Sequence, residues 1–489
     1  MRKHVFASSA CMIAAGVLLL VVSGCGGLQS DKIPITTSSA EAMEHYVQGR
    51  DLAERLQAQE SIQYFEKAIA ADPQFAMAYL NLSLVQPTAK GFFEQLDQAM
   101  ALVDQVTEGE RLQILGIRAA ADADPMKQRA LYQKLVDDYP NDERAHNLLA
   151  NNYFGQQEYA LAIPEYESAT RIAPEFSQPY NQLGYAHRFM SNLGEAQNAF
   201  RRYIDLIPDD PNPYDSYAEL LMKMGRYDAS IEEYHKALAL NSNFVASHLG
   251  IATNYNLKGE HADARKQLQQ LYDMARDDGE RRAALFAMAV SYVDEGDMDH
   301  AMEQMNRQFA RAEAIDDAAA MSGDLIAMGN CLFEAGRYEE ARAKYTQARL
   351  VILESDLAQE IKDNAELTFL YNIATIDTKN GDFAAAHAKA DRYTEAVTAK
   401  NNILQMRLAH QLAGMIALEE QDYDDALAEL EQANQLNPYN RYRMALACQG
   451  KGDLEQAREH CKAAAEFNAL NNINYAYIRS MAHERLASM

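Results

Sequence analysis

Small and large apolar residues recur along this chain with a long, regular period. Through the first half, a small residue returns every thirty-three or thirty-four positions. The residues that share this position are Gly49, Ser83, Gly116, Ala150, Gly184, Ala218 and Ala252. A second small residue follows twelve positions later in several units, as at Ala162, and a large apolar residue such as Tyr166 lies four further on. A fixed period of this length predicts a stack of one repeated supersecondary unit.

These phased positions resemble the tetratricopeptide repeat over residues 41–470. The resemblance implies an all-α fold in which helical hairpins, each with a helix A and a helix B, stack into a right-handed solenoid that binds other proteins. We expect about twelve repeats, the second degenerate because Gln95 replaces its small residue. The first repeats are also similar to those beside kinase and cyclase domains of bacterial signalling proteins. Close helix packing is assigned to Gly49, Gly116, Ala150, Ala162, Gly184, Ala196, Ala218 and Ala252.

The period divides the array into two parts. It is nearly strict over residues 41–275 and becomes longer and irregular over residues 276–471. The pattern leaves open whether the two parts form one continuous superhelix or two abutting blocks. Residues 472–489 carry apolar positions near helical spacing, and a solenoid needs a polar-faced terminal element, so we expect a capping helix there.

Six glycines share one register between helix A and helix B: Gly225, Gly259, Gly296, Gly336, Gly381 and Gly452. A glycine at a helix end is typical of a backbone with positive φ. We therefore expect left-handed turns at these six positions.

The N-terminus is typical of a targeting segment. Arg2 and Lys3 precede a short apolar run, and Val22-Ser23-Gly24-Cys25 looks like a bacterial lipobox. The resemblance implies that residues 1–24 are a signal peptide and that Cys25 receives palmitate and other acyl chains. An ordinary secretory signal or a plain membrane anchor are the alternatives. The residue after the cysteine is Gly26 rather than Asp, which favours an outer-membrane lipoprotein facing the periplasm. Residues 25–40 are expected to be a flexible tether.

The composition narrows the class of partner. The chain has 489 residues, 48% of them hydrophobic, and a formal net charge of −26. A solenoid accommodates this length because each repeat packs only against its neighbours. The negative surface repels nucleic acid and favours a basic or zwitterionic partner face.

Catalytic and metal motifs are not found in the sequence. It holds no GxxxxGK[ST], HExxH, GxSxG or CxxC pattern, so we predict no enzyme activity, cofactor or metal. Cys448 and Cys461 fall on helix A and helix B of one repeat. They could form a disulfide in an oxidising periplasm or pack as two buried thiols.

A strip of amide, aromatic and hydroxyl residues follows the predicted inner helices, with Asp215 beside it. Its members are Asn147, Asn151, Gln178, Asn181, Gln182, Tyr185, Arg188, Asn212, Thr253 and Asn256. Amides and aromatics in a groove suit an extended peptide, whereas a carboxylate clamp is disfavoured because its Lys and Arg partners are missing. The alternative is a solvated polar face. The leading hypothesis is a lipid-anchored scaffold for protein partners. A ligand- or peptide-sensing regulatory subunit is the alternative, and an enzyme with an unrecognised site is a remote one.

Overall fold

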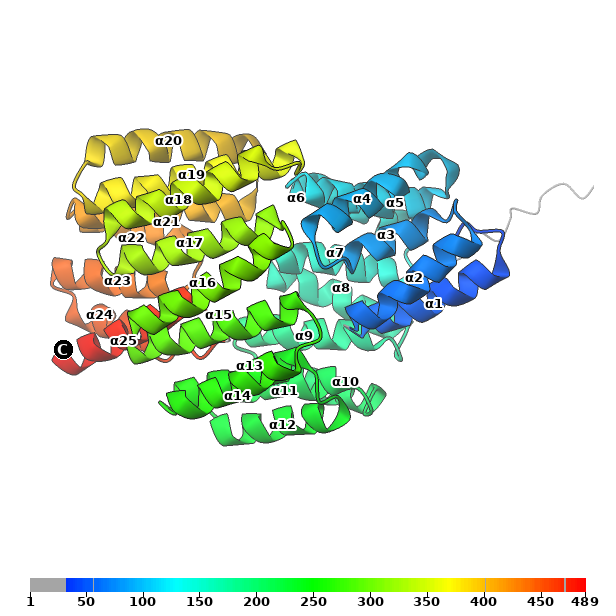
Figure 1. Ribbon diagram of the computed structural model, residues 1–489, viewed down its shortest axis with the longest axis horizontal. Coiled ribbons are helices and arrows are strands. Elements are labelled where there is room, and N and C mark those ends of the chain that lie inside the picture. The colour runs from blue at the N-terminus through cyan, green and yellow to red at the C-terminus, as the bar shows by residue number, and fades with distance from the viewer. Residues whose placement is uncertain (1–31, 56, 401, 470–471) are drawn as a thin grey trace, which may run out of the picture.

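The computed structural model describes residues 32–55, 57–400, 402–469 and 472–489. The predicted signal peptide and Cys25 lie outside these residues. Within them, every regular element is helical, as Figure 1 shows, which confirms the all-α prediction. None of the described helices combines the length and the apolar character that crossing a bilayer requires.

Twelve consecutive hairpins form the stack, and a final helix follows them, as expected. The helices of the first seven hairpins are α1 (Ala40–Glu54), α2 (Ala58–Ala71), α3 (Ala76–Leu84), α4 (Ala89–Ala101), α5 (Glu108–Ala121), α6 (Pro125–Asp138), α7 (Glu143–Gly155), α8 (Tyr159–Ile172), α9 (Ser177–Phe189), α10 (Leu193–Leu206), α11 (Pro211–Lys223), α12 (Tyr227–Leu240), α13 (Val245–Leu257) and α14 (His261–Met274). The others are α15 (Asp278–Glu295), α16 (Met298–Ala314), α17 (Ala318–Glu334), α18 (Tyr338–Glu354), α19 (Gln359–Lys379), α20 (Phe383–Lys400), α21 (Ile403–Glu419), α22 (Tyr423–Gln432), α23 (Pro438–Lys451), α24 (Leu454–Ala465) and α25 (Ile473–Ser488). Helices from α15 onward are mostly longer, in agreement with the longer period.

In most hairpins a small residue of helix A packs against a bulky residue of helix B. The two stand sixteen positions apart in the sequence. At Gly184, an added Cβ atom would lie 2.5 Å from the ring of Phe200, and at Gly49 it would lie 2.9 Å from that of Phe65. Both rings are fully buried. At these contacts no larger side chain fits between the paired helices without displacing the ring.

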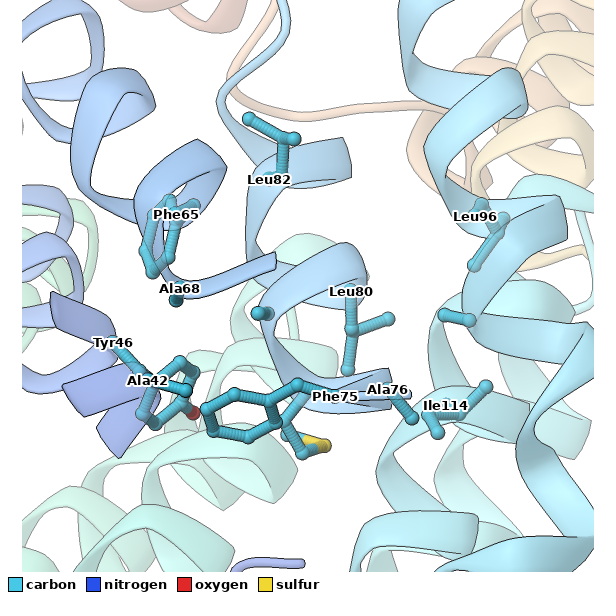
Figure 2. Packing of buried hydrophobic residues seen from close by; sticks show 13 residues of the cluster. Ala42, Tyr46, Phe65, Ala68, Phe75, Ala76, Leu80, Leu82, Leu96 and Ile114 are labelled. Carbon is cyan, nitrogen blue, oxygen red and sulfur yellow. The ribbon is translucent and has the colours of Figure 1, made fainter. Parts of the chain in front are cut away.

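Aromatic rings also join one repeat to the next. Figure 2 shows this packing in the first repeats, where Tyr46, Phe65 and Phe75 lie together with Leu80 and Ile114. The ring centroids of Tyr46 and Phe75 are 4.9 Å apart. The core is thus a continuous seam between neighbouring layers rather than one central cluster.

Six of the turns between helix A and helix B have a glycine with positive φ, as predicted. Four further turns of this kind place another residue there: Ala123, Gln157, Ser191 and Gln421, with φ between 56° and 66°. A non-glycine residue is strained in this region. The turn geometry is therefore imposed by the packing of the two helices and does not depend on glycine.

The two parts of the array form one continuous stack that coils back on itself, so that they lie side by side in Figure 1. Helix α14 packs on α15 across the predicted boundary. Polar side chains then join distant repeats: Arg407 donates to Gln157 Oε1 at 2.7 Å, and Arg276 pairs with Glu60 at 3.0 Å. The array is therefore one superhelix whose turns touch.

The second half of the expected tether is not free. The amide of Ile33 donates to Asp142 Oδ2 at 3.0 Å, and the amide of Thr36 donates to Glu110 Oε1 at 2.7 Å. Ile33 also packs beside Tyr139. The prediction of a flexible tether is wrong for residues 32–39, because buried carboxylates near the starts of α5 and α7 accept their hydrogen bonds. Residues 25–31 lie outside the described part of the chain.

Helix α25 does more than cap the last hairpin. It packs on α24 and α23, and it also reaches α15 and α17 from much earlier repeats. Ile473 and Ala476 belong to one buried cluster with Val290 and Leu325. The predicted capping helix therefore also closes the inside of the second part of the stack.

The Gly184 contact can be tested by a bulky substitution. We expect Gly184→Leu to destabilise the protein by about 3 kcal/mol or more, because the new side chain must displace the Phe200 ring from a close-packed layer. The matched control is Gly194→Ala, since a Cβ atom at Gly194 meets nothing within 4 Å. Thermal unfolding followed by circular dichroism measures both. An unchanged melting temperature for Gly184→Leu would show that the helix pairing is wrong.

Candidate functional site

The ten predicted groove residues all lie on A helices of four successive repeats, α7, α9, α11 and α13. Five are almost completely buried, with exposed fractions of 3–5%: Asn147, Asn181, Asn212, Thr253 and Asn256. The other five are half-buried: Asn151, Gln178, Gln182, Tyr185 and Arg188. The strip is therefore an interior surface, and the alternative of a solvated polar face does not describe its buried half.

Several of these side chains hold helices together. The Asn212 amide donates to the Tyr203 hydroxyl at 2.7 Å, and Asn256 Oδ1 accepts from Ser291 at 2.8 Å. Asn151 Oδ1 accepts from the Tyr166 hydroxyl at 2.7 Å. Because their polar groups are satisfied inside the fold, these residues contribute to packing rather than to an empty binding surface.

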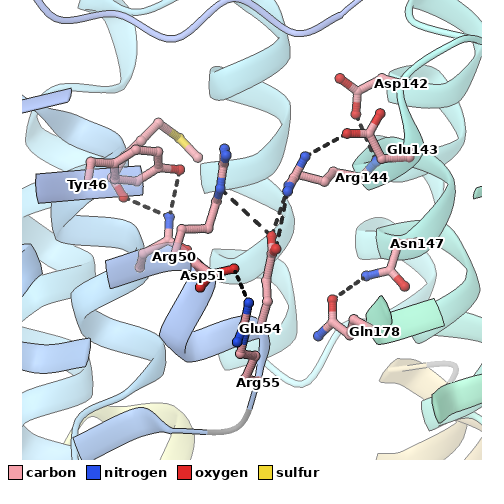
Figure 3. Close-up of polar contacts among 12 residues, drawn as sticks. Tyr46, Arg50, Asp51, Glu54, Arg55, Asp142, Glu143, Arg144, Asn147 and Gln178 are labelled. Carbon is pink, nitrogen blue, oxygen red and sulfur yellow. Dashed lines mark hydrogen bonds and ion pairs between the residues drawn. The ribbon is translucent and has the colours of Figure 1, made fainter. Parts of the chain in front are cut away.

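Two asparagines at equivalent positions keep a free acceptor. Asn147 and Asn181 are separated by one repeat, and the side-chain oxygen of each is buried without a hydrogen-bond partner among the described residues. The Asn147 amide donates to Gln178 Oε1 at 3.0 Å, as Figure 3 shows. The next residue in this register is Asp215, one repeat further on. We call Asn147, Asn181 and Asp215 the ladder.

The last rung of the ladder belongs to an acidic pair. Asp215 is 4% exposed and accepts a hydrogen bond from the Ser247 hydroxyl at 2.7 Å. Burial raises the pKa of Asp215 well above its usual range, and the nearby carboxylate of Glu219 raises it further. Glu219 in turn accepts from Arg188 at 2.9 Å. Among the described residues, Glu219 therefore has a contacting guanidinium and Asp215 has none.

Arg188 is also fixed by aromatic rings. Its guanidinium lies 4.8 Å from the ring centroid of Tyr185 and 5.0 Å from that of Phe189. Cation–π contacts of this kind hold an arginine in one orientation. Its Nη1 is thereby aimed at Glu219 on α11, which leaves Asp215 without a cationic contact.

The first repeat forms one wall beside the ladder. Glu54 of α1 pairs with Arg144 of α7 at 2.9 Å, as Figure 3 shows. Gln57, which follows α1, donates to Asp210 Oδ2 at 2.7 Å. Sequence reasoning missed this wall, because the two partners of these contacts are 90 and 153 residues apart in the chain.

The C-terminal segment forms the other wall. Arg479 of α25 donates to the backbone carbonyl of Leu257 at 2.7 Å and pairs with Asp294 at 3.1 Å. Lys223 lies 4.1 Å from the ring centroid of Phe467, and burial lowers the pKa of Lys223 to about 8. The segment thus covers the part of the strip that contains Thr253 and Asn256.

The two cysteines of the last repeat are free and buried. The Cys461 thiol donates to the backbone carbonyl of Ala482 at 3.3 Å, so it points towards α25. This contact turns the thiol away from a bridge across the hairpin. Of the two alternatives in the sequence, the disulfide is thus wrong and the buried thiols are present in the structure.

Family comparisons agree with the helical hairpins. One tetratricopeptide repeat model matches residues 115–175 and 218–280, and a second matches residues 177–210 and 409–440. With the twelve hairpins and their small-to-bulky contacts, these matches show that the chain belongs to the tetratricopeptide repeat family. Proteins of this family generally mediate protein–protein interactions.

Individual relatives are distant. The peroxisomal targeting signal receptor of Kluyveromyces lactis is 24% identical over 43% of this chain and 38% of that protein. DnaJ homolog subfamily C member 7 of Mus musculus is 24% identical over 62% of each chain. The chain therefore spans less than two thirds of these relatives' length. A crystal structure of a tetratricopeptide repeat protein from Parabacteroides merdae is 14% identical over 53% of this chain and 97% of the other, with a TM-score of 0.38.

The raised pKa of Asp215 predicts that the stability of the folded chain depends on pH. Because the folded chain holds the Asp215 proton more strongly than the unfolded chain, its ionisation destabilises the fold. Stability therefore falls as the pH rises from the unfolded-state pKa, about 3.9, through the raised folded-state pKa. We expect Asp215→Asn to raise the melting temperature by a few degrees at neutral pH and to change it little near pH 4.

Melting curves across this pH range give the measurement. Asp205→Asn on α10 removes an exposed carboxylate of the same repeat pair and serves as the control. An Asp215→Asn variant that is less stable than the native chain at neutral pH would contradict the prediction.

Proposed function

We propose that this chain is a non-catalytic scaffold of a bacterial cell envelope, anchored by a lipid on Cys25, that holds an extended segment of a partner protein against the ladder. The partner segment lies along the inner faces of α7, α9 and α11. Its backbone amides donate to the asparagine side chains, and a basic side chain meets Asp215. Binding and positioning of the partner is the activity.

The observation that carries this proposal is the pair of buried, unpartnered acceptors at Asn147 and Asn181. An unsatisfied buried polar group costs about 1–3 kcal/mol. Two such groups in the same register of successive repeats suggest a partner that is itself repetitive, and a peptide backbone offers an N–H group at every residue except proline. Capture of extended chains by aligned polar groups is a common mode of peptide recognition.

The charge of the site favours a basic segment. Arg188 contacts Glu219 but not Asp215, and the chain as a whole carries a net charge of −26. A lysine or arginine of the partner would complete the acidic pair and favour ionisation of Asp215. The same negative charge disfavours nucleic acid as a partner.

Access to the ladder requires one wall to move. The contacts of the first repeat with α7 and α11 are polar, as in the Glu54–Arg144 pair and the Gln57–Asp210 hydrogen bond. A partner segment carries hydrogen-bonding and charged groups of the same kind, so these contacts can be exchanged for contacts with a partner. We therefore propose that the partner segment enters beside α1 and not beside α25, which is held by apolar packing.

The anchor would hold the stack close to the membrane. Six residues separate Cys25 from Lys32, which pairs with Glu143. A chain of that length reaches at most about 25 Å. If the anchor lies in the outer membrane, as Gly26 favours, the partner segment would bind in the periplasm, close to that membrane.

The ladder is tested by Asn181→Ala. We expect this change to leave the melting temperature unchanged or slightly higher, because it removes an unpartnered buried acceptor, while it weakens partner binding by roughly tenfold or more. Peptides selected from a display library on the native chain provide the ligands, and fluorescence anisotropy measures their dissociation constants.

Asn198→Ala on α10 is the matched control, since Asn198 is an exposed asparagine of the same repeat. Selected peptides should be rich in lysine and arginine, and Asp215→Asn should reduce that preference. Equal affinity of the native and Asn181→Ala chains would refute the ladder as the binding surface.

The anchor has a separate test. Cells that produce the full chain are grown with an alkyne-tagged palmitate, and labelling of the purified protein is read by fluorescence after coupling. We expect label on the native chain and on Cys448→Ser, which keeps Cys25, and no label on Cys25→Ser. Label that persists on Cys25→Ser, or an unlabelled native chain, would exclude the lipid anchor.

A further inference from the structure

A second interior site lies far from the ladder, inside the later repeats. The C-terminal ends of α17, α19 and α21 converge there on α23 and α25 and enclose a cavity of about 220 Å³. A cavity of this size has room for several water molecules. Charged and apolar side chains both line the cavity. The kind of ligand that it can hold depends on which of these charged groups already have a partner.

Most charges in the lining have partners. Glu334 accepts a hydrogen bond from the Tyr439 hydroxyl, and Lys379 pairs with Glu419. Burial raises the pKa of Glu334, while Arg443 and Lys379 oppose that rise. Glu419 is thus neutralised by Lys379, while Glu334 is bonded to a neutral hydroxyl and its burial disfavours the negatively charged form.

Arg443 is the exception. Its Nη1 donates to Asn440 Oδ1 at 3.0 Å, and its guanidinium lies 4.2 Å from the ring centroid of Tyr439. Within the part of the chain that the structure describes, it forms no ion pair with a carboxylate. A guanidinium has five N–H donors in a planar fork that fits a carboxylate with two parallel hydrogen bonds. Most of these donors therefore stay available in a partly enclosed space.

One side of the binding chemistry is supplied by apolar residues of the lining. Met415 and Leu418 of α21 and Met481 of α25 contribute flexible or branched side chains without polar groups that need a partner. A ligand that satisfies both parts of the cavity must combine one compact anionic group with an apolar body.

We propose that this cavity binds a small amphipathic carboxylate, with its head group on Arg443 and its apolar body against Met415, Leu418 and Met481. A cationic ligand is disfavoured because the Arg443 guanidinium already occupies the face of Tyr439 and the Glu334 carboxylate is bonded to the Tyr439 hydroxyl. A neutral apolar ligand would leave Arg443 desolvated without an added counter-charge. The site is independent of the ladder and of any protein partner.

Three probes of equal length separate these alternatives. The full purified chain is titrated by calorimetry with hexanoate, hexylamine and hexan-1-ol. We expect saturable binding of hexanoate, at least tenfold tighter than binding of either other probe. Binding of hexylamine or hexan-1-ol as tight as that of hexanoate, or no binding of hexanoate at all, would overturn the proposal.

Variants then locate the binding site. Arg443→Gln should weaken hexanoate binding about 10- to 100-fold, the loss expected for a charge-assisted hydrogen bond, and Arg443→Lys should recover part of it. Arg441→Gln, on the same helix but outside the cavity lining, is the matched control and should bind normally. Equal losses at both positions would overturn the assignment.

A second variant keeps Arg443, so that a loss of binding cannot be attributed to misfolding caused by replacing this residue. Met481 is 39% exposed, so Met481→Glu is compatible with the fold. The new carboxylate would compete for Arg443 and should reduce hexanoate affinity with the melting temperature preserved. Undiminished binding in a folded Met481→Glu chain would contradict the proposed site.

Discussion

The close approach of two helices within each hairpin is the constraint on which the whole structure depends. A small residue on helix A, such as Gly184, accepts the ring of a residue on helix B, such as Phe200, at a distance that leaves no room for a side chain. That contact fixes the angle of the hairpin and forces the turn into positive φ, even where the residue is Gln157 or Ser191. Twelve hairpins of the same geometry must then coil, because each adds a similar rotation.

The coiling of the superhelix determines how much of the surface of each hairpin is enclosed. The superhelix closes until its turns touch, and polar pairs such as Arg276–Glu60 join repeats that are far apart in the sequence. Residues 32–39 and α25 cover two sides of the stack with hydrogen bonds and apolar contacts. As a result, side chains that a free-standing hairpin would expose are enclosed, and their unpaired polar groups become costly.

The two interior sites differ in the charge that remains unsatisfied. On the inner helices of the first part, carboxyl groups exceed contacting cations, and Asn147 and Asn181 keep free acceptors. In the cavity of the second part, the carboxylates are bonded and Arg443 remains without an ion pair. Repeats of one kind thus form two sites that favour ligands of opposite charge. The small and bulky packing positions recur along the array, whereas the polar residues on the inner helices differ from one repeat to the next.

The sequence by itself determined the repeat, the number of hairpins, the six glycine turns and the small packing positions, because these depend on contacts inside one hairpin. It also placed the polar strip on the right helices. Only the tertiary structure decided that residues 32–39 are bound, that Cys461 faces α25, and that the side-chain oxygen of Asn181 is buried with no donor among the described residues. The physical reason is that each depends on packing outside a single hairpin, which no local pattern encodes. The coil of the stack, a sum of many small rotations, places α5 and α7 beside residues 32–39, and the docking of α25 places Ala482 beside Cys461.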